Sequence, residues 1–482
     1  MFVFGRKSKT LKMIIRALCL ALLVVPVVSR TPAPHPCPDR NPDPKIQCSC
    51  SDEIIDCSAR GLTELPIFNV DTFYKELRLD HNAIENITDD AFKNLHQLNR
   101  LFLQNNNISR VERAAFRGVE KPINRIDLSN NFLEEFPVAI GDLEAITWVD
   151  VTNNPINENH FDEHTMYQIG DTITRFEFGS SHVESWPHTI RHLQALEFLN
   201  VSGGSFYTLP PEAFHGFEGT LTTLSIQHTK LIALPLALAR LRFLDRLYFD
   251  HNHDIGDSGV LIPSFGNSDL LNKLRFISLV DDHLTVFPSL LQFLRNVEEL
   301  VLDSNSLAFV SDTSVQVAVG TKITELSLRN CSLSRVPGAL SKLTNLTKLN
   351  LAENQIHSFE NSDFDNMGKL MNLTITRNPL GYIANETFKD LVNLRYLDLK
   401  ESNINTMPEA IRFLRNLQEL KLPSDKIECT CNIVWLKQFM EHCNTGLRID
   451  GSCETISYPV DVYLRDFIPR CPNYVNGTAC VN

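Results

Sequence analysis

The segment Leu346-Thr-Lys-Leu-Asn-Leu-Ala-Glu-Asn-Gln-Ile356 decides the fold of this 482-residue chain, because its pattern recurs along most of the sequence. Each copy has apolar residues at positions 1, 4, 6 and 11, and usually asparagine at position 9. Fifteen copies lie between residues 74 and 427, and most of them are 23 to 25 residues apart. Position 9 of the copies is occupied by Asn82, Asn106, Asn131, Asn154, Ser181, Gly204, Thr229, Asn252, Asp282, Asn305, Cys331, Asn354, Asn378, Ser402 and Asp425.

Positions 3 to 7 of each copy predict a short β-strand whose alternate residues point inward and outward. One such strand cannot bury its own apolar residues, so neighbouring copies must stack. A buried asparagine at position 9, where the chain turns away, can satisfy backbone groups of its own and adjacent turns. Ser181, Thr229 and Cys331 are shorter residues expected to fit the same slot, whereas Gly204 predicts a local defect or an ordered water.

The remaining residues of each copy predict a convex back of two kinds. One kind carries a phenylalanine after a small or polar residue, and stacking of these rings would form an apolar spine: Phe92, Phe116, Phe214, Phe364 and Phe388. The other carries a proline after an apolar residue, which suits an irregular back: Pro137, Pro187, Pro235, Pro288, Pro337 and Pro408. Strands lie about 4.8 Å apart and the backs need more room, so the stack should curve with its strands inside.

This pattern is the leucine-rich repeat signature. The sequence therefore predicts an α/β-type solenoid, a leucine-rich repeat horseshoe of about 15 repeats with a parallel β-sheet on its concave face and disulfide caps at both ends. The predicted boundaries are 1–29 for a signal peptide, 30–73 for an N-terminal cap, 74–427 for the repeats, 428–471 for a C-terminal cap and 472–482 for a short tail.

The first residues resemble a secretory signal peptide. Five basic residues precede the apolar run 17–28, and Ser29 fits the small-residue rule for cleavage. The alternative is a retained signal anchor, but the run is shorter than the roughly 20 residues that span a bilayer. The tail has no hydrophobic stretch of the kind a GPI signal needs. We expect a protein secreted into the extracellular space, without a stable membrane anchor.

Cysteines cluster at the two ends of the repeats, which is typical of an oxidising compartment. The twelve cysteines include Cys19 of the signal segment, which leaves eleven, an odd number. Four precede the repeats and six follow them, so Cys331 at a ladder position is the odd one. It is expected to be a buried unpaired thiol; the alternative is an intermolecular disulfide.

Two cysteine-containing stretches resemble the caps of animal extracellular leucine-rich repeat proteins such as Slit and the Nogo receptor. They are Cys48-Ser-Cys50 with Cys57-Ser-Ala-Arg-Gly-Leu-Thr-Glu-Leu-Pro66, and Cys429-Thr-Cys431-Asn-Ile-Val-Trp-Leu436 with Cys453 and Cys471. The resemblance implies the pairs Cys37–Cys50, Cys48–Cys57, Cys429–Cys453 and Cys431–Cys471. The sequence departs from the family in the long gap after Cys37, in the segment 423–428 and in two extra cysteines, Cys443 and Cys480, which are the leftover pair.

Eight sequons predict N-glycosylation of a secreted chain: Asn86, Asn107, Asn200, Asn330, Asn345, Asn372, Asn385 and Asn476. Asn200 and Asn372 fall at outward positions of their strands, so glycans there would obstruct docking on repeats 6 and 13. Without the five basic residues of the signal segment, 40 Lys and Arg face 58 Asp and Glu, a net charge of −18 with neutral histidine. Such a chain favours basic protein partners or simple solubility and lacks the basic face that nucleic acid requires.

Two short strings resemble metal sites. His160-Phe-Asp-Glu-His164 matches the H-x-x-E-H string of inverzincin proteases, but that motif needs a regular helix, which a convex segment does not predict. Asp250-His-Asn-His-Asp254 resembles a calcium loop without the glycine and glutamate that an EF-hand requires. We therefore expect no metal, no cofactor and no enzymatic activity.

Aromatic residues at concave positions mark the candidate binding surface, because exposed aromatics favour binding hot spots. Their number is no greater than the overall 9% aromatic content predicts, so only their clustering in repeats 2 to 9 is informative. The predicted binding residues are Phe102, Asp127, Trp148, Asp150, Tyr248, Asp250 and Phe276. The alternative is a set of scattered surface aromatics, such as Tyr396 near the other end.

The resemblance implies a secreted glycoprotein that binds another extracellular protein through its concave surface, without catalysis. The alternative function is that of a non-catalytic scaffold subunit in a secreted enzyme complex. The sequence does not name the partner.

Overall fold

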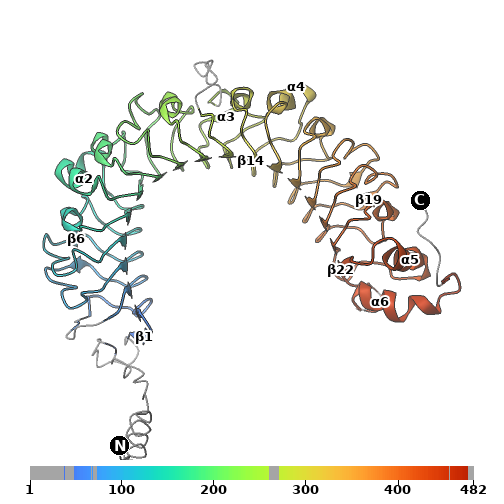
Figure 1. The fold of residues 1–482 in the computed structure, drawn as a ribbon, viewed down its shortest axis with the longest axis horizontal. Coiled ribbons are helices and arrows are strands. Elements are labelled where there is room, and N and C mark those ends of the chain that lie inside the picture. Colours follow the sequence, from blue (N-terminus) through green and yellow to red (C-terminus); the bar gives the residue numbers. More distant parts are fainter. Residues whose placement is uncertain are drawn as a thin grey trace, which may run out of the picture.

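The protein is a curved solenoid in the computed structural model, which describes residues 37, 48–66, 68, 73–259, 271–454, 456 and 458–475. Strands line the inner edge of the arc, and the helices α2 (Glu163–Ile169), α3 (Gly256–Gly259) and α4 (Asp312–Val315) lie on its outer edge (Figure 1). The predicted horseshoe, with its sheet on the concave face, is therefore confirmed.

The inner edge of the described chain is one 18-stranded sheet in which neighbouring strands follow chain order. Only β1 pairs antiparallel, with β2, and both belong to the N-terminal cap. Each predicted repeat contributes one parallel strand, and β2 and β22 extend the sheet into the caps. Equivalent residues pair directly, as Leu326, Leu349 and Leu373 do. The strands are β1 Ser49–Ser51, β2 Ile54–Asp56, β3 Glu76–Arg78, β5 Arg100–Phe102, β7 Arg125–Asp127, β8 Trp148–Asp150, β9 Arg175–Phe178, β10 Phe198–Ser202, β11 Thr223–Gln227, β12 Arg246–Tyr248, β13 Phe276–Ser278, β14 Glu299–Val301, β15 Glu325–Ser327, β16 Lys348–Asn350, β18 Asn372–Thr374, β20 Tyr396–Asp398, β21 Glu419–Lys421 and β22 Arg448–Asp450.

Buried asparagines at position 9 form a ladder that joins consecutive repeats. The Oδ1 atom of Asn354 accepts from the backbone N–H groups of Cys331 and Leu333, at 2.9 and 3.0 Å. Its Nδ2 atom donates to the carbonyls of Leu328 and Leu351, at 2.8 and 3.0 Å. The amide thus satisfies backbone groups of two repeats at once. The same arrangement recurs at Asn106, Asn131, Asn154, Asn305 and Asn378.

Two of the predicted substitutes occupy the ladder slot. Thr229 is buried, and its hydroxyl donates to Asn252 Oδ1 at 2.6 Å. Cys331 is fully buried and unpaired, and its Sγ atom donates to the carbonyl of Leu302 at 3.2 Å. Burial raises the pKa of the Cys331 thiol to about 12. The predicted buried free thiol is confirmed.

Repeats 5 and 6 depart from the ladder, and the prediction for Ser181 is wrong. Ser181 is exposed and Ser180 is buried in its place. The cause is Gly179, which has a φ of 124° beside the backbone of Ser202, one residue before the left-handed position that Glu353 occupies in repeat 12. At Gly204 the ring of Phe206 occupies the space where a side chain would begin, so a ring fills the predicted defect.

The proline-containing backs are more regular than expected. Each of the six prolines is the N-cap of a five-residue 3-10 helix, because its fixed φ suits the first turn. These helices are η1 Val138–Asp142, η3 His188–His192, η4 Leu236–Arg240, η6 Ser289–Phe293, η8 Gly338–Lys342 and η9 Glu409–Phe413. Shorter 3-10 helices on the back are η2 Glu158–His160 and η7 Gln316–Ala318.

The phenylalanine-containing backs stack as predicted. Phe92 and Phe116 are buried, with ring centroids 5.9 Å apart, and Phe364 and Phe388 are 6.1 Å apart. Two small parallel sheets lie on the same backs: β4 (Asn86–Ile87) with β6 (Arg110–Val111), and β17 (Ser358–Phe359) with β19 (Tyr382–Ile383).

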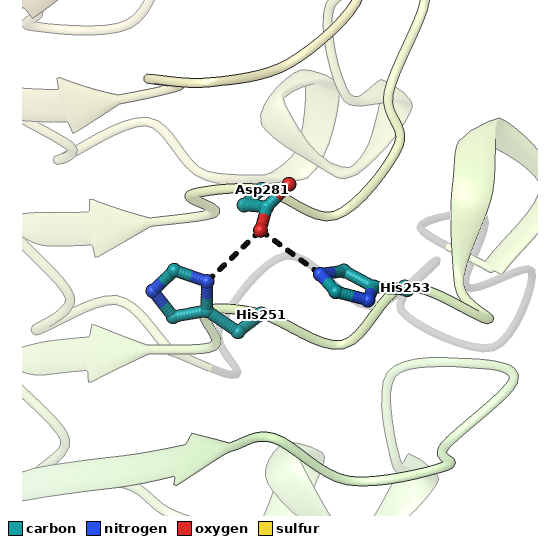
Figure 2. A group of neighbouring side chains, drawn as sticks. All are labelled: His251, His253 and Asp281. Carbon is teal, nitrogen blue, oxygen red and sulfur yellow. Dashed lines mark hydrogen bonds and ion pairs between the residues drawn. The ribbon is translucent and has the colours of Figure 1, made fainter.

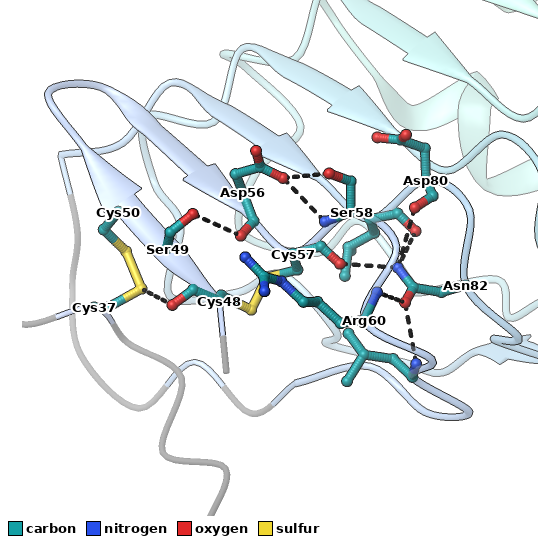
Figure 3. The surroundings of a disulfide bond; sticks show 12 residues. Cys37, Cys48, Ser49, Cys50, Asp56, Cys57, Ser58, Arg60, Asp80 and Asn82 are labelled. Carbon is teal, nitrogen blue, oxygen red and sulfur yellow. Dashed lines mark hydrogen bonds between the residues drawn. A yellow bond between two sulfur atoms is a disulfide. The ribbon is translucent and has the colours of Figure 1, made fainter. Parts of the chain in front are cut away.

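The four disulfides that the family resemblance implies are all present: Cys37–Cys50, Cys48–Cys57, Cys429–Cys453 and Cys431–Cys471. Asn82 of the first repeat bonds to backbone groups of Cys57 and Arg60 in the N-terminal cap, so the ladder continues into the cap (Figure 3). The C-terminal cap contains η10 Cys431–Ile433, α5 Val434–His442, α6 Val460–Asp466 and η11 Ile468–Arg470.

Some predictions fall on residues outside the described part of the chain. Cys443 is disulfide-bonded, but its predicted partner Cys480 lies outside the described residues. The signal peptide 1–29, Asn476 and the tail beyond residue 475 also lie outside them. No helix in the described ranges combines the length and apolar character that crossing a bilayer requires.

The ladder predicts a large cost for removing one central amide. Asn354→Ala leaves two backbone donors and two carbonyls without partners in the interior. We expect a loss of roughly 3 kcal/mol in the free energy of unfolding, measured by chemical denaturation. Asn416→Ala, which removes one exposed hydrogen bond to Val392, is the control and should cost less than about 1 kcal/mol. Equal losses in the two variants would contradict the ladder's role.

The caps should be the first parts to open under reduction, because each native bridge in a small unit contributes roughly 2–5 kcal/mol. Limited proteolysis in mild reductant should release fragments that begin near Asp52 or end near Glu428. Uniform resistance along the chain would be evidence against two separately stabilised ends.

Candidate binding surface on the concave face

Arginines and aromatics alternate along one row of the concave face. Arg125, Trp148, Arg175 and Phe198 are the first residues of four neighbouring strands, β7 to β10. The parallel register places each of them directly opposite the next. Because every second residue of a strand points to the same face, all four side chains lie on the concave surface.

The side chains of this row stack on one another. The Cζ atom of Arg125 lies 3.1 Å from the ring centroid of Trp148 and 4.7 Å from that of Phe102. The Cζ atom of Arg175 lies 4.4 Å from Trp148 and 3.8 Å from Phe198. Each guanidinium thus lies against two rings, where cation–π attraction holds both. We call these five residues the arginine–aromatic stack.

Three carboxylates form a second row beside the stack. Asp127, Asp150 and Glu177 are directly opposite one another in β7, β8 and β9. Glu177 is only 6% exposed and accepts from Trp148 Nε1 at 2.9 Å and from Arg175 Nε at 2.6 Å. It therefore ties the stack to the acidic row.

Crowding of these carboxylates changes their acidity. Burial first, and then the neighbouring charges of Asp127 and Glu177, raise the pKa of Asp150 to about 7 in opposition to the hydrogen bonds from Thr152. Burial also raises the pKa of Asp127, in opposition to hydrogen bonds from Ser129. Burial lowers the pKa of the Arg125 guanidinium. Asp150 thus titrates near neutrality in the middle of the surface.

A second aromatic group lies two strands further along. Tyr248 and Phe276 have ring centroids 4.7 Å apart, and Arg246 Cζ lies 3.9 Å from the Phe276 ring. Phe276 was predicted to be a binding residue, but it is only 6% exposed. Its ring therefore supports Tyr248 and Arg246 from below and offers little surface to a partner. Asp250 Oδ1 accepts from Ser278 Oγ at 2.6 Å and from the Val280 N–H at 2.9 Å, which fixes the next strand.

The structure thus brings Phe102, Asp127, Trp148 and Asp150 into one surface and places Tyr248 in a second. Asn200 lies between them, half-buried, and its Nδ2 atom donates to Glu177 Oε2 at 3.2 Å. The sequence reading considered aromatics and aspartates and missed the residues that connect them: Arg125, Arg175, Glu177 and Arg246. Alignment of position 3 across the repeats would have revealed the alternation of arginine and aromatic residues.

Tyr396 in β20 is a useful contrast at the same strand position as Trp148. Its hydroxyl donates to Asp398 Oδ2 at 2.9 Å, and Lys421 Nζ lies 4.9 Å from its ring centroid. Its direct neighbours across the sheet are Asn372 and Glu419, so no aromatic continues the row there.

The protease-like string does not form one helix. His160 ends η2, and Asp162 is the N-cap of α2, in which Glu163 and His164 lie. The carboxylate of Glu163 bonds to Arg191 at 2.8 Å and His192 at 3.0 Å on the exposed back. The two histidines thus come from separate helices, unlike those of an inverzincin site.

The comparisons with known proteins agree with the fold. A family model described as leucine rich repeat matches residues 75–122, 321–380 and 368–427. The chain is 23% identical over 452 residues to podocan-like protein 1 of Mus musculus, covering 83% of this chain and 72% of that protein. It is 24% identical over 458 residues to podocan of Mus musculus, covering 88% and 72%. Lumican of Bos taurus is 27% identical over 258 residues, covering 51% and 71%.

The raised pKa of Asp150 predicts a dependence of stability on pH. The unfolded aspartate has a pKa near the ordinary value of 3.8 and the folded one near 7, so the folded state binds more protons in this window. Stability should therefore fall from about pH 4 to pH 7, at no more than about 1.4 kcal/mol per pH unit from this group. Asp150→Asn should remove that slope in denaturation experiments.

Asp127→Asn provides a related variant, since it removes one of the charges that repel Asp150. The slope should persist in it, but its upper end should move to lower pH. Identical pH profiles for the original protein and Asp150→Asn would rule out this source of the dependence.

Proposed function

We propose that this chain, an extracellular and non-catalytic leucine-rich repeat protein with cysteine-rich caps, binds another extracellular protein through its concave face. Its class rests on the similarity to podocan and lumican and on its repeats and disulfides. The concave use of the sheet rests on the arginine–aromatic stack, which is the single observation that carries the proposal.

The composition of the stack supports protein recognition. Tryptophan, tyrosine and arginine are enriched at binding hot spots, where each supplies a large contact area and a directed polar group. The stack presents such residues from neighbouring strands of a rigid sheet. Because each guanidinium already lies between two rings, little side-chain freedom remains to be lost on binding.

The acidic row gives the proposed partner a charge preference. Asp127, Asp150 and Glu177 gather negative charge beside aromatic rings, and the chain as a whole is acidic. A partner with basic side chains facing this row would relieve the repulsion among the carboxylates and gain attraction from them. We therefore infer a partner whose contact surface is basic and carries apolar or aromatic side chains for the rings.

Glycosylation of Asn200, which stays a prediction, would divide the surface. Its amide lies on β10 beside Phe198, at the end of the stack nearer the group around Tyr248, and a glycan there would occupy the space above β10 and β11. A partner would then engage either repeats 2 to 4 or repeats 8 and 9. Asn200→Gln would remove this barrier.

The test compares aromatic residues in equivalent positions. Trp148→Ala should weaken binding by at least about 2 kcal/mol, or about 30-fold in Kd, because it removes the ring between two guanidinium groups. Tyr396→Ala, at the same strand position in repeat 14, should leave binding unchanged. The original protein, Trp148→Ala and Tyr396→Ala, each glycosylated, are used for affinity purification from extracellular fluid. Quantitative mass spectrometry then identifies the partner that is lost only with Trp148→Ala, and the Kd of that partner is measured for each form.

Both variants should still be secreted and unfold cooperatively, since neither ring belongs to the core. Equal loss at Trp148 and Tyr396, or no loss at either, would sink the concave proposal and favour the back or a cap. Size-exclusion chromatography separates the alternative function: a constant co-eluting subunit with enzymatic activity would identify a scaffold of an enzyme complex.

A further inference from the structure

Two histidines and an aspartate come together at the edge of the sheet, apart from the surface described above. His251 Nδ1 lies 3.1 Å and His253 Nε2 lies 2.9 Å from the same oxygen, Asp281 Oδ2 (Figure 2). The three candidate donor atoms all lie within 4.8 Å of one another. The side chains remain partly exposed, at 36%, 53% and 34%, so solutes can reach them. We call these three residues the His–Asp cluster.

The ladder places these three side chains. His251 and His253 flank the buried Asn252 of repeat 8, and Asp281 precedes the buried Asp282 of repeat 9. The Asn252 N–H donates to Asp282 Oδ1 at 2.8 Å, which locks the two turns together. Residues that flank a buried position in consecutive turns must project on the same edge, so the donors are held before any ligand arrives.

Two more histidines hold the imidazole rings in place. The ring of His228 stacks on that of His251, with centroids 4.6 Å apart and planes 4° apart. The ring of His283 stacks on that of His253 at 4.8 Å and 18°, and its Nδ1 atom lies 2.9 Å from the carbonyl of His253. These contacts restrict the orientation of the two imidazole rings of the cluster.

We propose that the His–Asp cluster binds a zinc ion. Two imidazole nitrogens and one carboxylate oxygen are a ligand set that Zn²⁺ takes, with a fourth, tetrahedral position left for water. Calcium prefers six to eight oxygen ligands, and Asp250 uses Oδ1 to accept bonds from the next strand, so the set disfavours calcium.

Other histidine–carboxylate pairs in the described chain lack the third donor. His81 Nδ1 lies 2.8 Å from Asp80 Oδ2, at the equivalent position of repeat 1, but no second histidine joins them. His81 and His251 share a left-handed backbone, with φ of 57° and 59°. The first pair is therefore a matched control for the cluster.

The test is a calorimetric titration of the complete glycosylated protein with zinc chloride after treatment with a chelator. We expect one saturable equivalent per chain. His253→Ala and Asp281→Asn should each weaken binding by at least about 100-fold, since loss of a ligand should exceed the 10- to 100-fold cost of second-shell changes. His251→Asn should do the same while keeping the left-handed turn, because asparagine tolerates positive φ. His81→Asn should bind zinc like the original protein.

Thermal unfolding gives an independent readout. Zinc should raise the midpoint of the original protein and of His81→Asn, but not that of Asp281→Asn, because binding to the folded state alone stabilises it. Equal midpoints without metal would establish that the variants are folded. The proposal is overturned by the absence of saturable zinc binding, by binding that survives all three cluster variants, or by equally tight binding of calcium chloride.

Discussion

The hydrogen bonding of the ladder position, which a buried asparagine amide occupies in about half of the repeats, governs the rest of the structure. The chain must turn away from every strand, and each turn leaves backbone donors and carbonyls that water cannot reach. The amide of Asn354 joins two such turns, and its equivalents do the same along the array. A fixed turn fixes the register of the strand before it, and the register decides which side chains meet on the concave face. The stack of Arg125, Trp148 and Arg175 is therefore a consequence of hydrogen bonds made on the other side of the sheet.

On the concave face, a row of carboxylates lies beside a row that contains arginines. Side chains directly opposite each other in a sheet interact strongly, and like charges there are unfavourable. The repulsion among Asp127, Asp150 and Glu177 is partly offset because arginines lie in the next row, and Arg175 donates a hydrogen bond to Glu177. Burial, with the remaining repulsion added to it, raises the pKa of Asp150 to about 7.

Much of this fold could be predicted from the sequence, because the repeat is a local pattern. Apolar spacing identifies the strands, and the resemblance of the caps implied the pairing of Cys429 with Cys453. The prediction failed where a contact joins two repeats and neither repeat alone carries a sequence pattern that indicates it. Gly179 displaced Ser181 because of its close approach to Ser202, some two dozen residues later. The same reason hid the guanidinium contacts and the histidine pairs, since their partners lie one full repeat apart.

The position of Cys331 in the ladder has a chemical consequence. Disulfide exchange requires a thiolate, and a thiol whose pKa is about 12 is almost entirely protonated at the pH of extracellular fluid. Its sulfur is also enclosed by the repeats, where no oxidant or second chain reaches it without opening of the array. An odd cysteine can therefore persist in an oxidising medium as a redox-silent residue, and alkylating reagents would label it only as a reporter of local unfolding.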